Sequence, residues 1–497
     1  MSVKNSFINY QKNNPLTMII VLMITFLAGF LYGKYAPRGP LTTQQVLILL
    51  AVSLLTGLVS GFFADSRVVR IITPVAIWAA FEVSRMGTVG PTVDRLNLAT
   101  TYGVIAFFLG RVIPFLLMLL PVFVGIQSGR LLNNILSHDR QENVTSLSWI
   151  LTISGIVLVV YIAVLLLRKP ATAPILDQNG GPLHGSIAEI VSPNIGGHDQ
   201  AIMIRGKNTQ LPVLLFLAGG PGGTELGTMR NDVSLEDHFI VATWEQRGVG
   251  KSYPALDPVH TLTLDQMIAD THEVTRYLMD RFDEEKIYLA GNSWGTLLGV
   301  LAVQENPELY HAFIAAGQMV SVRETDIMFY EDTLQWAREA GNNTLVRKLE
   351  VIGPPPYDDL LNYEHAVGHE HDWNPYPYLN LSLEMPSNLL VPENTLIDKI
   401  NGLRSFLDTF SVLYLQIQDV DLREDVANFP VPLYLALGKY ESRGRSVLAV
   451  EWFNMVDAPN KEMILFEKSG HRPIFEEPGK FSELMQEIQE ETYYEGN

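Results

Sequence analysis

Cysteine is absent from the 497-residue sequence, which excludes disulfide bonds, cysteine-ligated zinc or iron–sulfur centres and a thiol nucleophile. Charged residues are scarce at 18%, whereas apolar residues reach 47%, a composition that excludes an intrinsically disordered chain. The charges are also unevenly distributed: residues 1–170 hold 13 Lys and Arg against 5 Asp and Glu, and residues 171–497 hold 22 against 49. Because nucleic-acid binding needs a basic face, the acidic second part predicts no nucleic-acid partner.

Long apolar runs fill the basic part, residues 1–170. Four runs, at residues 16–32, 41–63, 98–126 and 149–167, reach or approach the ~20 residues that a membrane-spanning helix needs. A fifth run, residues 71–81, is shorter and contains Pro74, as in re-entrant or interfacial segments. We therefore predict a multi-pass transmembrane module of four or five spans in a cell membrane, with the lipid bilayer as its partner. With five spans, Lys and Arg are equally divided between the two sides of the membrane, whereas with four spans their excess places both ends of the module in the cytoplasm. The side of the membrane that holds the acidic part is therefore undetermined.

One charged residue, Arg111, lies inside the third long run. A charge at membrane depth is costly and often functional, but Pro114 and Pro121 allow the run to bend. The favoured hypothesis is that Arg111 snorkels or pairs with Glu82. The module otherwise lacks catalytic residue types, since its one histidine, His138, lies in a polar loop and an intramembrane serine protease needs a histidine base at membrane depth.

The acidic part begins with residues 171–184, which are rich in Pro, Gly and Asn and predict a linker. Short β-rich runs follow, several of them continuous and apolar as in strands buried on both faces, with helical patterns between some of them. The runs are residues 187–191, 201–204, 213–217, 239–243, 287–290, 313–315, 433–437 and 463–466. Strands that alternate with helices predict an α/β fold with a mostly parallel, eight-stranded sheet. Residues 321–425 interrupt the alternation, so we predict a helical lid inserted between two core segments, residues 185–320 and 426–497.

The strongest chemical signal is the pentapeptide Gly291-Asn292-Ser293-Trp294-Gly295, a G-x-S-x-G motif. It directly follows an apolar run and directly precedes a helical pattern. On such a cramped strand-to-helix turn, small flanking residues let the chains approach, and the serine hydroxyl is exposed at the helix N-terminus. The same pattern also arises by chance in a long chain, but its strand and helix context favours Ser293 as a catalytic nucleophile.

A glycine-rich segment, residues 218–223, follows the third apolar run of the acidic part. It lacks the G-x-G-x-x-G pattern of dinucleotide sites and the Lys and Ser/Thr of a P-loop, so phosphate binding is disfavoured. Its place after the third strand instead predicts that the N–H of Gly220 points to the same spot as the N–H of Trp294. Two such donors form an oxyanion hole, each contributing about 3 kcal/mol of transition-state stabilisation.

The base in this kind of site is a histidine late in the chain, after the acid. His471 fits, because it follows the last predicted strand on a loop that contains Gly470. The acid is expected after residues 433–437, where Glu441 stands, and a glutamate can orient and stabilise a protonated imidazole as an aspartate does. Asp457 is the alternative acid, disfavoured because it follows a predicted helix.

Three further histidines, His365, His369 and His371, lie in the lid at spacings of four and two residues. Such spacing occurs in metal sites, but an exposed polar loop is the favoured interpretation. We therefore predict no metal and no cofactor.

Together these motifs resemble the proline iminopeptidase-like branch of the α/β-hydrolase superfamily. The resemblance covers about residues 185–497 and rests on GGPGG at 219–223, WEQRGVGKS at 244–252, GNSWG at 291–295, GKYE at 438–441 and SGH at 469–471. It implies an α/β-hydrolase fold in which Ser293 is the nucleophile, His471 the base and Glu441 the orienting acid, with Gly220 and Trp294 as oxyanion donors.

The sequence departs from the usual family patterns HGGPG, DQRG and GRYD at Ala218, Glu245 and Glu441. Loss of the loop histidine bears on substrate positioning more than on the chemistry.

The favoured function is a membrane-anchored serine hydrolase that works through an acyl-enzyme. The resemblance favours an aminopeptidase of proline iminopeptidase type, acting on a small peptide. A carboxylic ester hydrolase of lipase-like kind is the alternative, because Trp373, Tyr376 and Tyr378 form an aromatic lid loop and a membrane tether brings the site close to lipids. A non-catalytic membrane sensor with a hydrolase-like domain is disfavoured, since it has no need of a complete triad.

An aminopeptidase must recognise a free ammonium group, which requires carboxylates near the acyl site. The start of the lid is acidic, with Glu324, Asp326, Glu331 and Asp332 close together. Glu324 and Glu331 are seven residues apart, about two helical turns, so they share a helix face and are the predicted substrate-binding pair. A solvated helix face on an acidic domain is the competing interpretation.

Overall fold

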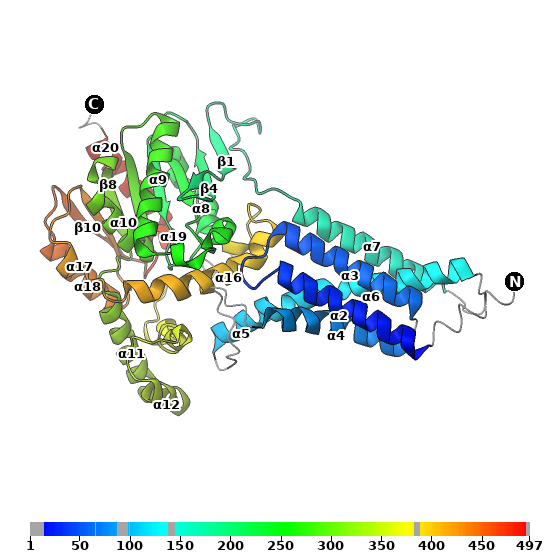
Figure 1. Cartoon of the computed structure of the whole chain (residues 1–497). Coiled ribbons are helices and arrows are strands. Elements are labelled where there is room, and N and C mark those ends of the chain that lie inside the picture. Colours follow the sequence, from blue (N-terminus) through cyan, green and yellow to red (C-terminus); the bar gives the residue numbers. More distant parts are fainter. Residues whose placement is uncertain are drawn as a thin grey trace. The chain divides into compact units, whose positions relative to one another are not determined.

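The computed structural model describes residues 14–64, 66–86, 98, 100–137, 145–381 and 388–493. The chain divides into two compact units. The helical unit comprises Met1–Leu96, Val104–Lys169 and Thr395–Ile397, and the sheet unit comprises Asn97–Gly103, Pro170–Asn394 and Asp398–Asn497. Figure 1 shows the helices and strands of both.

Four helical segments among the described residues are long and apolar enough to span a membrane: Pro15–Tyr35, Thr43–Phe63, Thr101–Leu136 and Ser146–Leu166. They are formed by α2 (Pro15–Tyr35), α3 (Thr43–Phe63), the continuous run of α5 (Thr101–Phe107), η1 (Phe108–Val112) and α6 (Ile113–Ser137), and α7 (Ser146–Leu166). Each corresponds to one of the four long apolar runs. The fifth, shorter run lies in α4 (Arg67–Arg85), where four charged residues within 19 keep the helix outside this set.

Glycines allow α3 and α6 to approach closely. A Cβ atom at Gly57 would lie 2.2 Å from the carbonyl oxygen of Val122, and one at Gly61 would lie 2.0 Å from that of Ile126. Two glycines of α6 meet α3 in the same way. Small residues four apart are a common means by which membrane helices pack. Contact between α3 and α6 therefore depends on the absence of side chains at these positions.

Arg111 lies in η1, a short π-helical turn. Its Nε atom is 4.0 Å from Oε2 of Glu82 on α4, so the predicted pairing with Glu82 is confirmed. Glu82 also accepts hydrogen bonds from Arg38 at 3.2 Å and from Arg85 at 3.4 Å. One carboxylate thus gathers three guanidinium groups, which offsets part of the cost of removing their charges from water.

An eight-stranded sheet forms the centre of the sheet unit, in the order β1-β4-β6-β5-β7-β8-β9-β10. The strands are β1 (Ile187–Val191), β4 (Ile202–Gly206), β5 (Val213–Leu217), β6 (Ile240–Trp244), β7 (Ile287–Asn292), β8 (Tyr310–Ala316), β9 (Leu433–Gly438) and β10 (Lys461–Phe466). β4 pairs antiparallel with β1 and β6, and the strands from β6 to β10 run parallel. Each predicted run forms one strand, so the mostly parallel eight-stranded sheet is confirmed. A separate hairpin joins β2 (Asn194–Ile195) to β3 (His198–Asp199).

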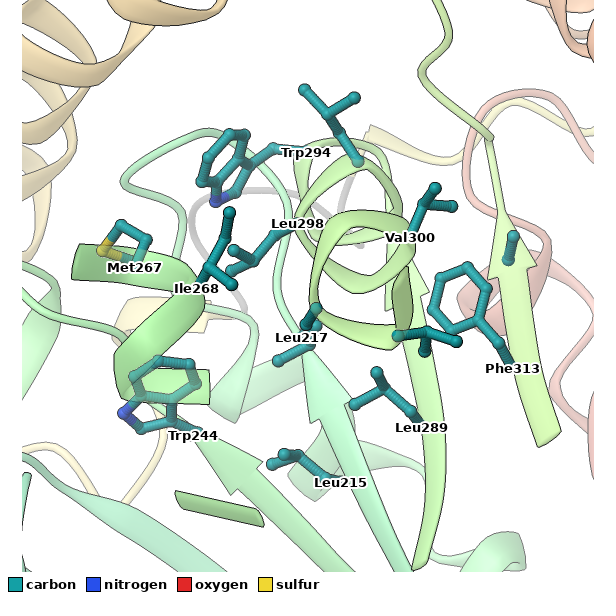
Figure 2. Close-up of a cluster of buried hydrophobic side chains, with 14 of the residues drawn as sticks. Leu215, Leu217, Trp244, Met267, Ile268, Leu289, Trp294, Leu298, Val300 and Phe313 are labelled. Carbon is teal, nitrogen blue, oxygen red and sulfur yellow. The ribbon is translucent and has the colours of Figure 1, made fainter. Parts of the chain in front are cut away.

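Apolar side chains fill both faces of this sheet. On β5, Leu215 and Leu217 enter one core, with α9 (Leu264–Phe282), α10 (Trp294–Glu305) and α18 (Arg443–Met455). Leu214 and Phe216 enter the other, with α8 (Leu226–Asn231) and α20 (Pro478–Thr492). Figure 2 shows the first core, where Trp294 extends from α10 toward α9. Each fully buried leucine stabilises the folded state by about 1.5–3 kcal/mol. Burial of both sheet faces explains why these strands are continuous apolar runs.

Residues 321–425, the predicted lid, lie between β8 and β9. Their helices are α11 (Val322–Glu339), α12 (Asn343–Ile352), α13 (Glu364–Val367), α14 (Glu370–Trp373), α16 (Leu396–Leu413) and α17 (Leu422–Asp425), with 3-10 turns η6 (Leu360–Tyr363) and η8 (Tyr414–Ile417). The remaining short elements are η2 (Ser234–Asp237), η3 (Gly250–Leu256), η4 (Val259–Thr261), η5 (Pro307–Leu309) and α19 (Pro473–Glu476).

The start of the predicted linker is fastened to the sheet unit. Arg205 on β4 donates from Nη1 to Thr172 Oγ1 at 2.7 Å and to the carbonyl oxygen of Ala173 at 2.6 Å. The Thr172 hydroxyl donates in turn to Glu393 at 2.9 Å. Hydrogen bonds therefore hold the start of the predicted linker, at Thr172 and Ala173, against the sheet unit.

Candidate active site

Ser293 lies on a sharp turn between β7 and α10. Its backbone has φ 54° and ψ −118°, a region that residues with side chains rarely adopt. The flanking glycines make the turn possible. A Cβ atom at Gly291 would lie 2.5 Å from the carbonyl oxygen of Gly295, and one at Gly295 would lie 2.1 Å from that of Leu217. The strand-to-helix context predicted for Ser293 is present.

His471 and Glu441 follow the neighbouring parallel strands β10 and β9, so their loops leave the same edge of the sheet. Nδ1 of His471 is 2.6 Å from Oε2 of Glu441. Because a carboxylate only accepts, Nδ1 carries the shared proton. Nε2 is then the nitrogen that can accept a proton from a serine.

The imidazole of His471 also lies against the end of β8. A Cβ atom at Gly317 would be 2.9 Å from both Nδ1 and Cε1 of the ring. The preceding residue, Ala316, accepts a hydrogen bond from the Ser293 N–H at 3.0 Å. The structure therefore brings Ser293, His471 and Glu441 to one edge of the sheet.

Glu441 is almost completely buried, with 1% of its side chain exposed. Burial alone would raise its pKa, but the charge and hydrogen bond of His471, the charge of Arg445 and the N–H of Ser442 together lower the pKa to about 2. The Ser442 N–H donates to Glu441 at 2.9 Å, and Arg445 donates at 3.4 Å. The acid is therefore ionised at neutral pH and can hold the imidazole of His471.

Asp457, the alternative acid, lies at the other end of β10. Its N–H donates to the carbonyl oxygen of Ala427 at 2.9 Å, just before β10 begins at Lys461. The length of the strand separates it from His471, which follows the strand's end. This geometry favours Glu441 over Asp457.

Residues 218–223 lie against the serine turn. A Cβ atom at Gly219 would be 3.3 Å from Cβ of Ser293. Gly220 has φ 129°, a backbone conformation that favours glycine, and Trp294 is the first residue of α10. The N–H groups of a first helical turn have no acceptor within the helix, so the N–H of Trp294 is suited to a ligand oxygen. The oxyanion role of Gly220 and Trp294 stays a prediction.

Gln246 links Trp294 to the glycine-rich loop by hydrogen bonds, a role that the sequence did not indicate. Its Oε1 accepts a hydrogen bond from the indole Nε1 of Trp294 at 2.9 Å, and its Nε2 donates to the carbonyl oxygen of Ala218 at 3.2 Å. The adjacent Glu245 accepts from Thr224 Oγ1 at 2.7 Å. The WEQRGVGKS segment therefore holds the glycine-rich loop and the residue after it by hydrogen bonds, at Ala218 and Thr224.

Glu225, which sequence reasoning also missed, is buried beside the glycine-rich loop. Its carboxylate accepts hydrogen bonds from the N–H of Gly219 at 3.2 Å, from Arg472 at 3.0 Å and from the Asn292 side chain at 3.4 Å. Burial raises the pKa of Glu225, and Arg472, the Gly219 N–H and His471 offset part of that rise. The one available signal was an acidic residue two positions after a glycine-rich turn.

The predicted substrate-binding residues lie on the outer face of α11. Glu324 forms an ion pair with Arg423 and has 40% of its side chain exposed, and Glu331 pairs with Arg443 at 3.4 Å with 60% exposed. The buried acid of this helix is Asp326, which accepts from the Tyr414 hydroxyl at 2.6 Å and whose pKa is raised by burial to about 7. Glu324 and Glu331 thus share a face, but that face is turned toward solvent and arginines. Their role in substrate binding stays a prediction.

The aromatic lid loop lies over the loops that carry the acid and the base. Tyr376 stacks on Tyr440, next to Glu441, with ring centroids 5.3 Å apart. A Cβ atom at Gly470, next to His471, would lie 2.8 Å from the Tyr376 hydroxyl, which donates to Glu476. Lid and catalytic loops are therefore in direct contact.

The lid histidine His369 has a structural partner. Its Nδ1 is 2.8 Å from Asp372, and its ring stacks on Trp336 with centroids 5.4 Å apart. Within the part of the chain that the structure describes, no group of three or more acidic or histidine side chains is placed to hold a metal ion.

Known proteins resemble the sheet unit. Residues 212–377 match the family described as the α/β hydrolase fold. A probable aminopeptidase of Bacillus subtilis, YbaC, is 29% identical over 317 residues, covering 61% of this chain and 97% of that protein. A proline iminopeptidase of Saccharolobus solfataricus is 23% identical over 303 residues, covering 58% and 87%.

Similar solved structures include a proline iminopeptidase-related protein from Thermus thermophilus, with a TM-score of 0.43, 19% identity and coverage of 62% of this chain and 98% of that one. A proline iminopeptidase from Mycobacterium smegmatis has a TM-score of 0.44, 16% identity and coverage of 62% and 99%. The matched family and the curated relatives confirm the resemblance drawn from the motifs. The chain contains an α/β-hydrolase domain and is a hydrolase.

Proposed function

We propose that this protein is a membrane-anchored serine aminopeptidase of proline iminopeptidase type. The observation that carries the proposal is the 2.6 Å pair between buried Glu441 and His471, beside the strained turn of Ser293. The similarity to a probable aminopeptidase and a proline iminopeptidase supports the substrate class, a small peptide with a free N-terminus. Four apolar helices support anchoring in a lipid bilayer.

In the proposed mechanism, Nε2 of His471 takes the proton of the Ser293 hydroxyl as Oγ attacks the scissile carbonyl carbon. The resulting oxyanion is stabilised by the N–H groups of Gly220 and Trp294. The C–N bond then breaks, the leaving amine takes the proton from His471, and an acyl-enzyme remains. A water molecule, deprotonated by His471, attacks the ester carbonyl carbon. The C–Oγ bond then breaks, Oγ takes the proton back from His471, and the amino acid leaves. Glu441 holds the ring and balances the charge of the imidazolium throughout.

The free ammonium of the substrate is assigned to Glu324 and Glu331. In the structure these carboxylates are held by Arg423 and Arg443, so substrate binding at this face requires them to exchange an arginine for the ammonium. Replacing either glutamate by glutamine then raises KM for free-amine substrates and leaves the rate with acyl esters unchanged.

A carboxylic ester hydrolase is the second candidate, favoured by the aromatic lid loop. Tyr376 and Tyr378 lie with Tyr440 beside the acid, and Tyr378 is 50% exposed, as suits an apolar acyl chain.

A substrate panel separates these functions. The purified full-length protein is assayed with prolyl- and alanyl-anilides, with their N-acetylated forms and with acyl esters. The proposal requires that free-amine anilides are cleaved and N-acetylated anilides are refused. Equal cleavage of both, or cleavage of acyl esters alone, assigns the ester hydrolase function instead, and no turnover of any substrate assigns a non-catalytic role.

A further inference from the structure

Glu225 connects three segments of the candidate site that are remote in sequence. Its hydrogen-bond donors are the N–H of Gly219 at 3.2 Å, Nδ2 of Asn292 at 3.4 Å and Nη2 of Arg472 at 3.0 Å. Gly219 directly precedes the oxyanion donor Gly220, Asn292 directly precedes the nucleophile, and Arg472 directly follows the base. One buried carboxylate therefore accepts hydrogen bonds from the chain neighbours of the nucleophile, of the base and of one proposed oxyanion donor.

We propose that Glu225 is a positioning residue that holds the oxyanion loop, the serine turn and the base loop in register, and that its negative charge stabilises the imidazolium of His471. The inference rests on the proposed function of Ser293 and His471. It adds a fourth side chain to the three of the triad, one that contacts the histidine loop through Arg472 rather than through His471 itself.

Two readouts separate the positional role of Glu225 from its electrostatic role: kcat reports the first, and the position of the acidic limb of kcat/KM reports the second. The N–H of Gly219 donates to Oε2 of Glu225, whereas Asn292 and Arg472 donate to Oε1. The single oxygen of a glutamine therefore satisfies one of these sides, and its NH2 group opposes a donor on the other. Among the described residues, Arg472 donates to Glu225 at 3.0 Å, and the charges of Arg472 and His471 both act on its carboxylate. Arg472 lies over the Phe475 ring at 4.6 Å, and its N–H donates to Glu476 at 3.2 Å, so its position has support besides Glu225. Glu225→Gln therefore keeps the size of the side chain but removes its charge and one of its two acceptor oxygens.

The test uses the full-length protein and the substrate that it turns over best, with kcat and KM measured across the pH range. Glu225→Gln is expected to lower kcat about 10- to 100-fold with KM little changed, because small displacements of catalytic groups carry costs of this size. Loss of the negative charge also disfavours the imidazolium, so the acidic limb of kcat/KM moves to lower pH, by about one pH unit. Arg472→Gln removes a positive charge and moves the same limb to higher pH.

A matched control is Glu236, a buried carboxylate that pairs with Arg205 at 2.6 Å in another part of the sheet unit. Glu236→Gln loses a comparable buried ion pair, so it lowers thermal stability but leaves the acidic limb in place. Glu225→Asp keeps the charge and is expected to retain the position of the limb even where kcat falls. If Glu225→Gln fails to fold, Arg472→Gln tests the effect of charge on the limb, and Glu225→Asp, which keeps the charge but shortens the side chain, tests the positional role through kcat.

The inference is overturned if Glu225→Gln and Arg472→Gln leave the limb in place or move it in the same direction. It is also overturned if Glu236→Gln lowers kcat as much as Glu225→Gln does. Full turnover by Ser293→Ala instead contradicts the proposed function itself. An inactive Ser293→Ala together with a Glu225→Gln variant that behaves like the parent protein removes only the role of Glu225.

Discussion

Glu441 accepts a hydrogen bond from Nδ1 of His471 at 2.6 Å, and the two residues follow adjacent parallel strands of the sheet. The pairing of β9 with β10 thus brings the loops that carry the two residues to the same edge of the sheet. Glu441 is buried and ionised, so the imidazole is held with one nitrogen protonated and the other free to act as a base.

The identity of the acid is tested by comparing Glu441→Gln with Asp457→Asn. The amide of a glutamine at position 441 cannot balance the charge of an imidazolium and favours the wrong tautomer, so kcat is expected to fall by up to about 10⁴-fold. Asp457→Asn is expected to change kcat less than about twofold. Steady-state kinetics of both purified variants decide the matter, and the reverse ranking would move the acid to Asp457.

Acid stability gives a second test of the environment of Glu441. Its pKa is about 2 in the folded protein, below its usual value of 4.5. The unfolded chain therefore binds the proton more readily, so the carboxylate stabilises the fold above pH 4.5 and this contribution is lost as pH falls toward 2. A difference of this size corresponds to about 3 kcal/mol. Urea unfolding at pH 5 and pH 3 should show the loss, and Glu441→Gln should make the unfolding free energy less dependent on pH in that range.

The hydrogen bonds of the predicted linker indicate where the chain can be truncated to obtain the sheet unit without the helical unit. A protein of residues 170–497 keeps the hydrogen bonds of Thr172 with Arg205 and Glu393, and is expected to be soluble, monodisperse and active on small substrates. A protein that begins at residue 185 loses them and should unfold several degrees lower, since each buried hydrogen bond to a charged group contributes about 1.5–3 kcal/mol. Calorimetry and size-exclusion chromatography compare the two. Aggregation or inactivity of residues 170–497 would show that the helical unit is needed for the site.

Glycine packing in the helical unit predicts a sharp difference between two positions on α3. Gly61→Leu places a side chain where a Cβ atom already lies 2.0 Å from the backbone of Ile126, so α3 and α6 must separate. Leu55→Ala on the same helix changes a side chain that is 60% exposed and serves as the control. The midpoint temperature of thermal unfolding, measured for the full-length protein in detergent, should fall markedly for Gly61→Leu and change by no more than about a degree for Leu55→Ala. Equal stability of both variants would contradict the close packing of α3 on α6.

Strands and motifs could be predicted from the sequence because their signals are local. A continuous apolar run bounded by glycine or proline marks a strand wherever it lies, and the G-x-S-x-G turn needs small residues at fixed positions. The pairing of Arg111 with Glu82 was one of two expected outcomes, since a charge among apolar residues needs either a partner or a path to water by snorkelling.

Other features depend on packing that no local pattern encodes. Glu324 and Glu331 share a helix face as expected, but whether that face turns inward is decided by what packs on α11, and Asp326 with Tyr414 occupies the buried side. The contacts of Glu225 and Gln246 join residues far apart in the chain. Likewise, the composition of residues 171–184 does not distinguish a free tether from a segment held by Arg205.

The most direct test of the serine hydrolase mechanism is covalent labelling of the full-length protein with a fluorophosphonate probe, followed by mass spectrometry of the labelled peptide. The proposal predicts one label, on Ser293, that is absent from Ser293→Ala, together with a loss of hydrolysis of about 10⁴- to 10⁶-fold in a variant that remains folded. His471→Ala should label far more slowly, because Ser293 then lacks its base. Labelling at another residue, or substantial hydrolysis by Ser293→Ala, would contradict the account.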